Sequence, residues 1–388
     1  MIYLAIDKLE PNSASANHFL GIVKHFHERN IPFKLVTFLP NPKERVRECE
    51  LYDYYNLAVD CPVKINWIVR LWNKLFEILF LHRRLRRFAR RLSADDSLFI
   101  YTGYRGLAEL IDSGCRLFLE YTEHPDVHDY ISTLKNRKDE VLREIARAAG
   151  VFVISTSLRN YYIATGVSPE RISIVNMFVD STRFLPVKKR PVATPYIAYC
   201  GTASNNKDGV DRLLKAFAIV AKEIDDVDLY IIGKTPTRKD SRSNLNLIDQ
   251  LGINDRVRFT GIISREEMPQ TLTNAAVLAL ARPDSQQARN GFPTKLGEYL
   301  LSGNPVVVTK TGDIPLFLED GVSAYLVEPD DIEGFARKLT LALKDKDAAM
   351  RIGRAGYEVA MKNFNYQIEA DKIVSRICSG EHTSCTDC

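Results

Sequence analysis

Short apolar runs rich in β-branched and aromatic residues recur along the chain, and amphipathic stretches of helical period separate them. Such runs, bounded by polar segments, are typical of strands buried on both faces of a parallel sheet. The first series of predicted strands is 2–6, 33–38, 98–102, 116–121, 151–155 and 172–175. A second series follows at 196–200, 228–232, 257–259, 277–281, 305–309 and 324–327.

The helix predicted after the first strand of each series has one apolar face. In the first series this face is formed at i, i+3, i+4 and i+7 by Phe19, Ile22, Val23 and Phe26. In the second it runs from Val210 to Ile224. Alternation of strands and helices predicts an α/β fold with two doubly wound parallel sheets, whose ligands bind beyond the carboxyl ends of the strands.

The length of 388 residues suits two domains. A polar, kinked stretch from Pro186 to Pro195 marks the linker, so we place the domains at 1–186 and 187–360. We expect residues 361–377 to form a helix that crosses back to the first domain, and residues 378–388 to form a flexible polar tail. The tail contains His382, Cys385 and Cys388, but it lacks paired metal-binding knuckles, so we expect no metal there.

Composition is that of a globular protein, with 45% apolar and 26% charged residues. No apolar run is long enough to span a membrane. The chain enters a strand pattern at its first residues without a basic leader, so we expect no signal peptide and a cytoplasmic protein. Seven cysteines without framework spacing predict reduced thiols, in agreement with that location.

The segment 64–92 differs from the rest of the chain in its charge. It has nine Lys or Arg residues and one acidic residue, Glu77, whereas the net charge of the chain is only +4. Both tryptophans, Trp67 and Trp72, interleave with these cations, which favours contact with an anionic membrane surface. A buried helix with a solvated basic end remains an alternative. A nucleic-acid patch ranks last because no recognition module accompanies the charge, so we expect no nucleic-acid partner.

The polar loop and helix that follow the predicted strand 277–281 hold the most informative chemistry. Pro293 and Thr294 suit the start of a short helix, so free backbone N–H groups and the positive end of a helix dipole should reach the rim of the sheet. Lys295 adds a full charge, and Glu298 lies one turn further on. A diphosphate bound by Lys295, with Glu298 accepting bonds from sugar hydroxyls, fits these residues. A solvated Lys–Glu pair fits the local pattern equally well.

A second turn of interest follows the predicted strand 196–200. Gly201 permits a sharp turn and the close approach of a ligand, and Lys207 precedes the next helix, where it would neutralise a phosphate. The alternative is an ordinary strand–helix turn with a surface lysine.

Taken together, these stretches resemble the retaining glycosyltransferases of family 4, which have the GT-B fold of two Rossmann-like domains facing a cleft. The resemblance runs in order through 174–186, 201–207, 258–261, 290–309 and 312–321. It implies a nucleotide diphosphate sugar as donor, bound mainly by the C-terminal domain. We expect no metal or other cofactor, because Lys207, Lys295 and helix amides can offset the charge of the phosphates. The implied donor site consists of Gly201, Thr202, Lys207, Gly261, Ile262, Arg282, Asn290, Gly291, Phe292, Pro293, Thr294, Lys295 and Glu298.

Within this resemblance Lys207 matches the phosphate-binding lysine of the family, and Glu298 matches a glutamate that contacts the ribose. The backbone of Gly261 and Ile262 would lie beside the base. Two positions depart from the family pattern. Thr202 stands where the family has a phosphate-binding arginine, and Lys295 and Arg282 are the candidates to supply that charge. Asn290 stands where the first of two glutamates is usual, and an amide cannot act as a carboxylate nucleophile.

In the N-terminal domain, Glu123 and His124 follow the predicted strand 116–121. Similar enzymes have a histidine near this point that contacts the transferred sugar, so Glu123 and His124 are catalytic candidates in this domain. Asn290 in the C-terminal domain is the third catalytic candidate, because it can form hydrogen bonds to the sugar. A histidine satisfied by loop hydrogen bonds is the alternative. The loop 11–17 matches the family's glycine-rich loop only weakly.

These observations predict a retaining glycosyltransferase that acts on a glycan or lipid-linked acceptor in bacterial surface polysaccharide synthesis, at the inner face of the membrane. Three alternatives remain open: an inverting transferase, a GT-B sugar-nucleotide epimerase and a non-catalytic sugar-nucleotide-binding subunit. The basic aromatic segment argues against the epimerase. Thr202 and Asn290 are the residues that suggest the non-catalytic subunit.

Overall fold

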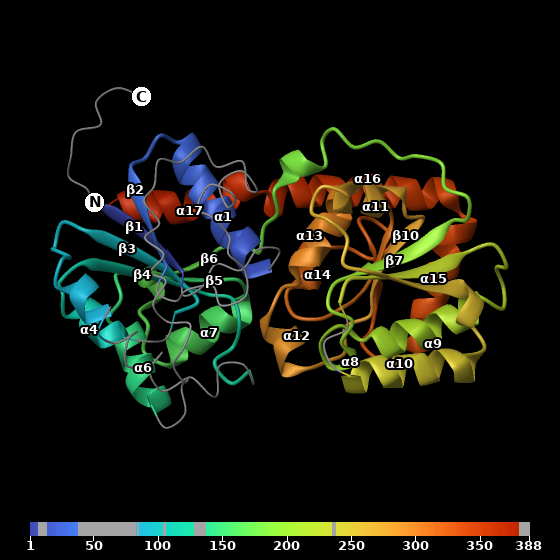
Figure 1. Ribbon diagram of the computed structural model, residues 1–388, viewed down its shortest axis with the longest axis horizontal. Coiled ribbons are helices and arrows are strands. Elements are labelled where there is room, and N and C mark those ends of the chain that lie inside the picture. The colour runs from blue at the N-terminus through green and yellow to red at the C-terminus, as the bar shows by residue number, and fades with distance from the viewer. Residues whose placement is uncertain are drawn as a thin grey trace, which may run out of the picture. The chain divides into compact units, whose positions relative to one another are not determined.

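The computed structural model describes residues 1–6, 14–37, 83, 85–103, 106–127, 137–234 and 238–379. The chain forms two compact units (Figure 1). The first unit contains residues 1–176 and 366–388, and the second contains residues 177–365.

The first unit is built on a six-stranded sheet in the order β2-β1-β3-β4-β5-β6. Its strands are β1 (Ile2–Ile6), β2 (Phe33–Thr37), β3 (Ser97–Tyr101), β4 (Arg116–Tyr121), β5 (Gly150–Val153) and β6 (Ile172–Ile174). All pairings are parallel. The order reverses at β1, which pairs with β2 on one side and β3 on the other.

Helices cover both faces of this sheet (Figure 1). On one face lie α1 (Ala14–Glu28) and α17 (Tyr366–Cys378), which pack on each other. On the other lie α4 (Leu107–Ile111), α6 (Lys138–Ile145) and α7 (Thr156–Ala164). The apolar face predicted for the first helix is buried, because Phe19, Ile22 and Phe26 are fully covered.

The second unit has a parallel sheet in the order β12-β11-β10-β7-β8-β9. Its strands are β7 (Tyr196–Cys200), β8 (Asp228–Ile232), β9 (Val257–Gly261), β10 (Val277–Leu280), β11 (Val306–Thr309) and β12 (Tyr325–Val327). Here the order reverses between β7 and β10, the first and fourth strands of the unit. That reversal is the topological switch point of a doubly wound fold.

The helices of the second unit also form two layers (Figure 1). One contains α9 (Val210–Val220), α10 (Arg238–Leu251) and α15 (Ile332–Lys344), and the other α11 (Met268–Asn274), α13 (Thr294–Leu301) and α16 (Lys346–Asn363). Three short helices border the loops: α8 (Asn205–Asp208), α12 (Gln286–Asn290) and α14 (Ile314–Phe317).

The predicted fold class is confirmed, and each predicted strand has a counterpart that begins and ends within two residues of the predicted bounds. The division of the chain differs from the sequence-based boundaries. The first unit ends at Asn176, ten residues before 186, because the following segment packs on the second unit: Val179 N donates to Phe364 O at 3.0 Å. The second unit ends at Asn365, and the helix expected at 361–377 begins at Tyr366.

The segment 64–92 lies outside the described residues except for Arg83 and 85–92. In this part Leu85 and Ala89 are buried, the Phe88 ring packs edge-on against Tyr3 at 5.4 Å, and Arg86 is exposed and pairs with Glu109. This end therefore has a buried apolar side and a solvated basic side. The tryptophans, residues 11–13 and the tail from 380 also lie outside the described residues. No helix in the described part of the chain combines the length and apolar character needed to cross a membrane.

Candidate functional site

The candidate site lies at the carboxyl edge of the second sheet, at the switch point. The chain leaves β7 at Gly201 and β10 at Ala281, and these two neighbouring strands diverge into loops there. Ligands of doubly wound folds bind in the crevice that such diverging loops create. Gly261, at the end of β9, lies on the same edge, since its carbonyl accepts from Gly233 N at 2.8 Å.

The backbone at Gly201 strongly favours glycine. Its φ of 143° lies in the region that L side chains disfavour, and a Cβ there would overlap the ammonium of Lys295. The Lys295 side chain thus crosses from α13 and ends against the backbone of Gly201. This brings together two of the residues that the sequence placed in separate stretches.

The Lys295 ammonium has a carboxylate and a phenol as neighbours. Nζ lies 2.5 Å from Asp208 Oδ2 and 4.9 Å from the centroid of the Tyr199 ring. The Tyr199 hydroxyl donates to the same Asp208 oxygen at 2.6 Å and accepts from Lys295 Nζ at 3.3 Å. The side chain of Lys295 is 17% exposed and that of Asp208 only 3%, so the pair is shielded from water on most sides.

Burial and the mutual attraction of the two charges act in opposite directions on this pair. Burial lowers the pKa of Lys295, and Asp208 opposes that effect. Burial likewise acts to raise the pKa of Asp208, but the Lys295 ammonium and the Tyr199 hydroxyl outweigh it, so the pKa of Asp208 lies below its ordinary value. Burial, followed by the charge of Asp208, raises the pKa of Tyr199 well above its ordinary value, so its hydroxyl stays protonated as a donor.

Glu298 has a different partner. Arg183, from the segment that enters the second unit, donates to Glu298 Oε1 at 2.9 Å and to the carbonyl of Arg265 at 2.7 Å. Lys295 and Glu298 therefore do not pair with each other; each lies against a residue far away in the chain.

The loop between β10 and α13 is largely closed by its own contacts. Asn290 donates from Nδ2 to Gln286 O at 2.8 Å, within the short helix α12. Gly291 and Phe292 are buried, and the Phe292 ring lies 4.8 Å from that of Phe364 in an aromatic cluster. The side chain of Phe292 is thus part of the core.

Helix α13 begins at the residues that the sequence suggested, Pro293 and Thr294. Pro293 occupies the capping position with extended backbone, and Thr294 is already the first helical residue. No side chain caps the helix. In its first turn Leu296 N donates to Pro293 O at 2.9 Å, whereas the N–H groups of Thr294 and Lys295 have no side-chain cap.

The other predicted donor-site residues lie on the rim. Thr202 and Lys207 are exposed, Lys207 at the end of α8, and Ile262 is 71% exposed just after β9. Arg282 is only 3% exposed, and its positive charge acts on both Asp208 and Lys295.

Sequence reasoning missed Tyr199, Asp208 and Arg183 as site residues. Asp208 directly follows Lys207 and precedes Gly209, so its position at a strand–helix turn was the only signal available. Arg183 lies within 174–186, a stretch that the family resemblance includes, but nothing in the sequence pattern indicated a role for it.

The candidates in the first unit, Glu123 and His124, follow β4. His124 is 7% exposed, its ring lies 4.3 Å from that of Tyr161, and its Nδ1 accepts from Asp126 N at 3.2 Å. Burial lowers the pKa of His124, so the imidazole is neutral at pH 7. One ring nitrogen is thus used by the loop, as in the alternative interpretation, and Glu123 is half-buried beside it.

No group of three or more His, Cys, Asp or Glu side chains is arranged to hold a metal ion within the ranges that the structure describes. The charged side chains at the candidate site include those of Lys295, Arg282, Lys207 and Asp208, together with the ion pair of Arg183 and Glu298.

Comparison with known proteins adds to this geometry. Residues 194–345, which contain all of the candidate site except Arg183, match the model of the glycosyl transferases group 1. The chain resembles the Anabaena protein HepE, solved in complex with UDP-glucose, with a TM-score of 0.74 and 16% identity over 98% of this chain and 100% of that one. The fold is that of the GT-B glycosyltransferases.

Two curated relatives are similar over part of their length. An MMP alpha-(1->4)-mannosyltransferase of Mycolicibacterium hassiacum is 31% identical over 58% of this chain and 52% of the relative. A putative colanic acid biosynthesis glycosyltransferase, WcaL of Escherichia coli, is 27% identical over 52% of this chain and 50% of the relative. The chain thus matches about half the length of these relatives. Together the likenesses show the GT-B fold.

Proposed function

We propose that this chain is a retaining glycosyltransferase that moves a hexose-type sugar from a nucleotide diphosphate sugar to a glycan or lipid-linked acceptor. The observation that carries the proposal is the Lys295 ammonium seated against Gly201 at the switch point of the second sheet. An ammonium and open backbone at a strand–helix turn suit a diphosphate. The structural relative that binds UDP-glucose supports this class of donor.

The proposed chemistry places the donor diphosphate beside Lys295, with Lys207 and Arg282 adding positive charge. As the bond between the sugar and the diphosphate breaks, negative charge grows on the leaving phosphate, and fixed cations stabilise it. Asn290 provides no carboxylate, so we propose that the diphosphate leaves and the acceptor attacks on the same face of the sugar. Retention of the anomeric configuration in the product, read by NMR, is the expected outcome; inversion contradicts this mechanism.

We assign the nucleoside and acceptor contacts to flanking residues. A carboxylate bound by Arg183 has further acceptor capacity, so Glu298 is available to a ribose hydroxyl. Gly261 and Ile262 would border the base. The neutral imidazole of His124, with Glu123 beside it, would orient the sugar or acceptor.

We further propose that the reaction serves bacterial surface polysaccharide synthesis at the cytoplasmic face of the membrane. The likeness to WcaL and the basic segment 64–92 support this setting. Purified protein should co-sediment with anionic liposomes at low salt and dissociate at high salt, and failure to co-sediment removes the membrane part of the proposal. Because cations from the chain offset the phosphate charge, transferase activity should persist in the presence of a chelator. Loss of activity in the chelator, with recovery on addition of manganese, would refute metal independence.

The donor site is tested by thermal shift with UDP, GDP, CDP and ADP. One nucleotide should raise the Tm of the protein, and Lys295→Ala should abolish the rise. Lys344→Ala, at an exposed lysine of α15 that pairs with Glu223, is the matched control and should keep it. No shift with any nucleotide would refute the proposal.

Donor hydrolysis separates an enzyme from a non-catalytic binding subunit. A transferase slowly releases free sugar from its donor in the absence of acceptor, whereas a binding subunit does not. Binding without any hydrolysis or transfer would therefore favour the subunit.

A further inference from the structure

The Lys295 ammonium of the candidate site contacts two residues that the donor-site assignment does not use, Asp208 and Tyr199. Asp208 is 2% exposed, receives hydrogen bonds from both Lys295 and Tyr199, and ends the short helix α8. The next residue, Gly209, has a φ of 68°, and a Cβ there would overlap the carbonyl of Ala281 at the end of β10. The backbone beside this carboxylate is therefore fixed against the sheet itself.

An unrestrained lysine is a poor fixed charge because its stem has four rotatable bonds. In this site the Tyr199 ring supports the ammonium from one side at 4.9 Å, and Asp208 Oδ2 holds it at 2.5 Å. The two contacts point the ammonium at the backbone of Gly201, the place where the chain opens onto the rim.

The charge of Lys295 also depends on its neighbours. The groups that face it are Asp208 on α8, Tyr199 and Cys200 on β7, and Arg282 after β10. Burial and the charge of Arg282 both favour the neutral amine, and Asp208 is the ionised carboxylate that opposes them. Burial raises the pKa of Cys200 to about 12, so this thiol carries no charge near neutral pH.

We propose that Asp208 and Tyr199 are positioning residues that hold the Lys295 ammonium protonated against Gly201, so that the donor diphosphate meets a preformed cation. This inference rests on the proposed function and deepens it. The carboxylate of Asp208 by itself repels phosphate. Through its contact with Lys295, however, it favours phosphate binding.

Simple charge and positioning predict opposite results for Asp208→Asn. If Asp208 acted only through its own charge, its removal would strengthen the binding of a diphosphate. If it positions Lys295, removal should weaken the binding of UDP, or of the nucleotide identified above, by roughly tenfold. The loss should increase with pH, because the variant's Lys295 gives up its proton at lower pH than the wild-type residue does.

The experiment is calorimetric titration of the full chain with UDP from about pH 6 to pH 9.5, for wild type, Asp208→Asn, Tyr199→Phe and the control Asp211→Asn. Asp211 lies on α9 and pairs with Arg212, so its variant removes a nearby carboxylate that has a different partner. Tyr199→Phe removes only the hydroxyl and should shift the affinity in the same direction by less. In a Lys295→Met background, Asp208→Asn should cause no further loss.

The outcomes distinguish the two proposals. Wild-type protein that binds none of the four nucleoside diphosphates would refute the proposed function itself. Wild-type binding with equal or tighter binding by folded Asp208→Asn at every pH overturns the positioning role and leaves the function standing. If Asp208→Asn does not fold, Tyr199→Phe decides: an unchanged affinity and pH profile overturn the inference, and a weaker affinity with an earlier decline at alkaline pH supports it.

Discussion

At the scale of single residues, Gly201 and Gly209 show how the same substitution can affect binding or folding. Gly201→Ala would place a methyl group against the end of a flexible lysine, which can move away. We expect this variant to fold with a loss of about 1–3 kcal/mol, but to lose most of its affinity for the nucleotide, because the displaced ammonium no longer faces the phosphate. Titration calorimetry and thermal unfolding measure the two effects separately.

Gly209→Ala is the matched comparison. Its methyl group would overlap the backbone carbonyl of Ala281 at a φ of 68°, and backbone in a sheet cannot move aside cheaply. We therefore expect a larger fall in Tm than for Gly201→Ala. Unchanged nucleotide affinity in Gly201→Ala would contradict the role given to Lys295.

His124 makes a pH-dependent contribution to stability. Burial lowers its pKa, with Asp126 acting in the opposite direction. The unfolded chain binds a proton near pH 6.5, whereas the folded chain binds it only at lower pH, so stability falls as the pH drops through 6.5 towards the folded value. In His124→Gln the urea midpoint should change less between pH 7 and pH 5.5. The exposed His27→Gln should behave as wild type, and equal pH dependence in all three proteins would contradict the argument.

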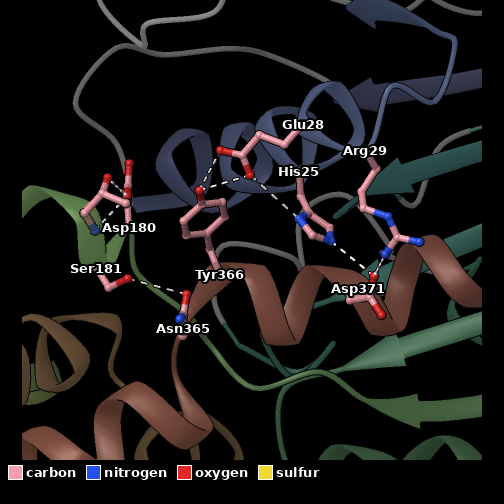
Figure 2. Close-up of polar contacts among 9 residues, drawn as sticks. His25, Glu28, Arg29, Asp180, Ser181, Asn365, Tyr366 and Asp371 are labelled. Carbon is pink, nitrogen blue, oxygen red and sulfur yellow. Dashed lines mark hydrogen bonds and ion pairs between the residues drawn. The ribbon is translucent and has the colours of Figure 1, made fainter. Parts of the chain in front are cut away.

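At the scale of elements, helix α17 contributes to the first unit through its packing on α1. Figure 2 shows Tyr366 at the start of α17 donating to Glu28 at 2.8 Å, and Asp371 one and a half turns later paired with Arg29 and 3.3 Å from His25 Nε2. Beneath these polar contacts, Ile373 is fully buried. The apolar contact carries most of the stability, since exposed ion pairs contribute little.

Ile373→Ala should therefore destabilise the first unit by about 2–5 kcal/mol, through lost burial and the cavity left behind. Ile368→Ala, in the same helix but at a residue that is 45% exposed, should change stability by less than about 0.5 kcal/mol. Denaturant unfolding followed by circular dichroism measures both. Similar losses in the two variants would mean that α17 does not stabilise through its buried face.

The elements themselves were predictable because parallel strands are buried on both faces and read as continuous apolar runs. Strands β3 and β7 are buried at every residue and were found almost to the residue. Strand β9 was predicted two residues short, since it lies at the sheet edge and four of its five residues are exposed. The boundary expected at 186 and the end of the first compact unit at Asn176 differ, because the prolines mark where the chain is irregular, whereas Val179 shows where its packing changes.

The candidate site was predictable only in part. Local spacing identified the loop, Lys295 and Glu298, because a glycine turn and a helix start are properties of neighbouring residues. Their partners are distant in sequence: Asp208 lies 87 residues from Lys295, and Arg183 lies 115 residues from Glu298. No periodicity connects such pairs; the sheet topology does, by bringing the ends of β7 and β10 together.

At the scale of the whole molecule, the two units differ in continuity. The second unit is one uninterrupted segment, 177–365, with its own buried sheet. The first is completed only when the chain returns at Tyr366 and adds α17. Each unit has a separate core, so the full chain should unfold in two calorimetric transitions rather than one.

The two transitions should respond to different changes. A nucleotide that binds the second unit should raise only that unit's transition, since ligand stabilises the state that binds it. A chain that ends after Asn365 lacks α17 and uncovers apolar residues of α1. The unfolding temperature of the first unit should therefore fall by several degrees, or its transition should disappear, while the nucleotide-responsive transition of the second unit remains. A chain that ends after Ser379 keeps α17 and should behave as the full protein. If ending the chain after Asn365 also removed the response to nucleotide, the second unit would depend on α17, and the assignment of a self-sufficient donor site to residues 177–365 would be wrong.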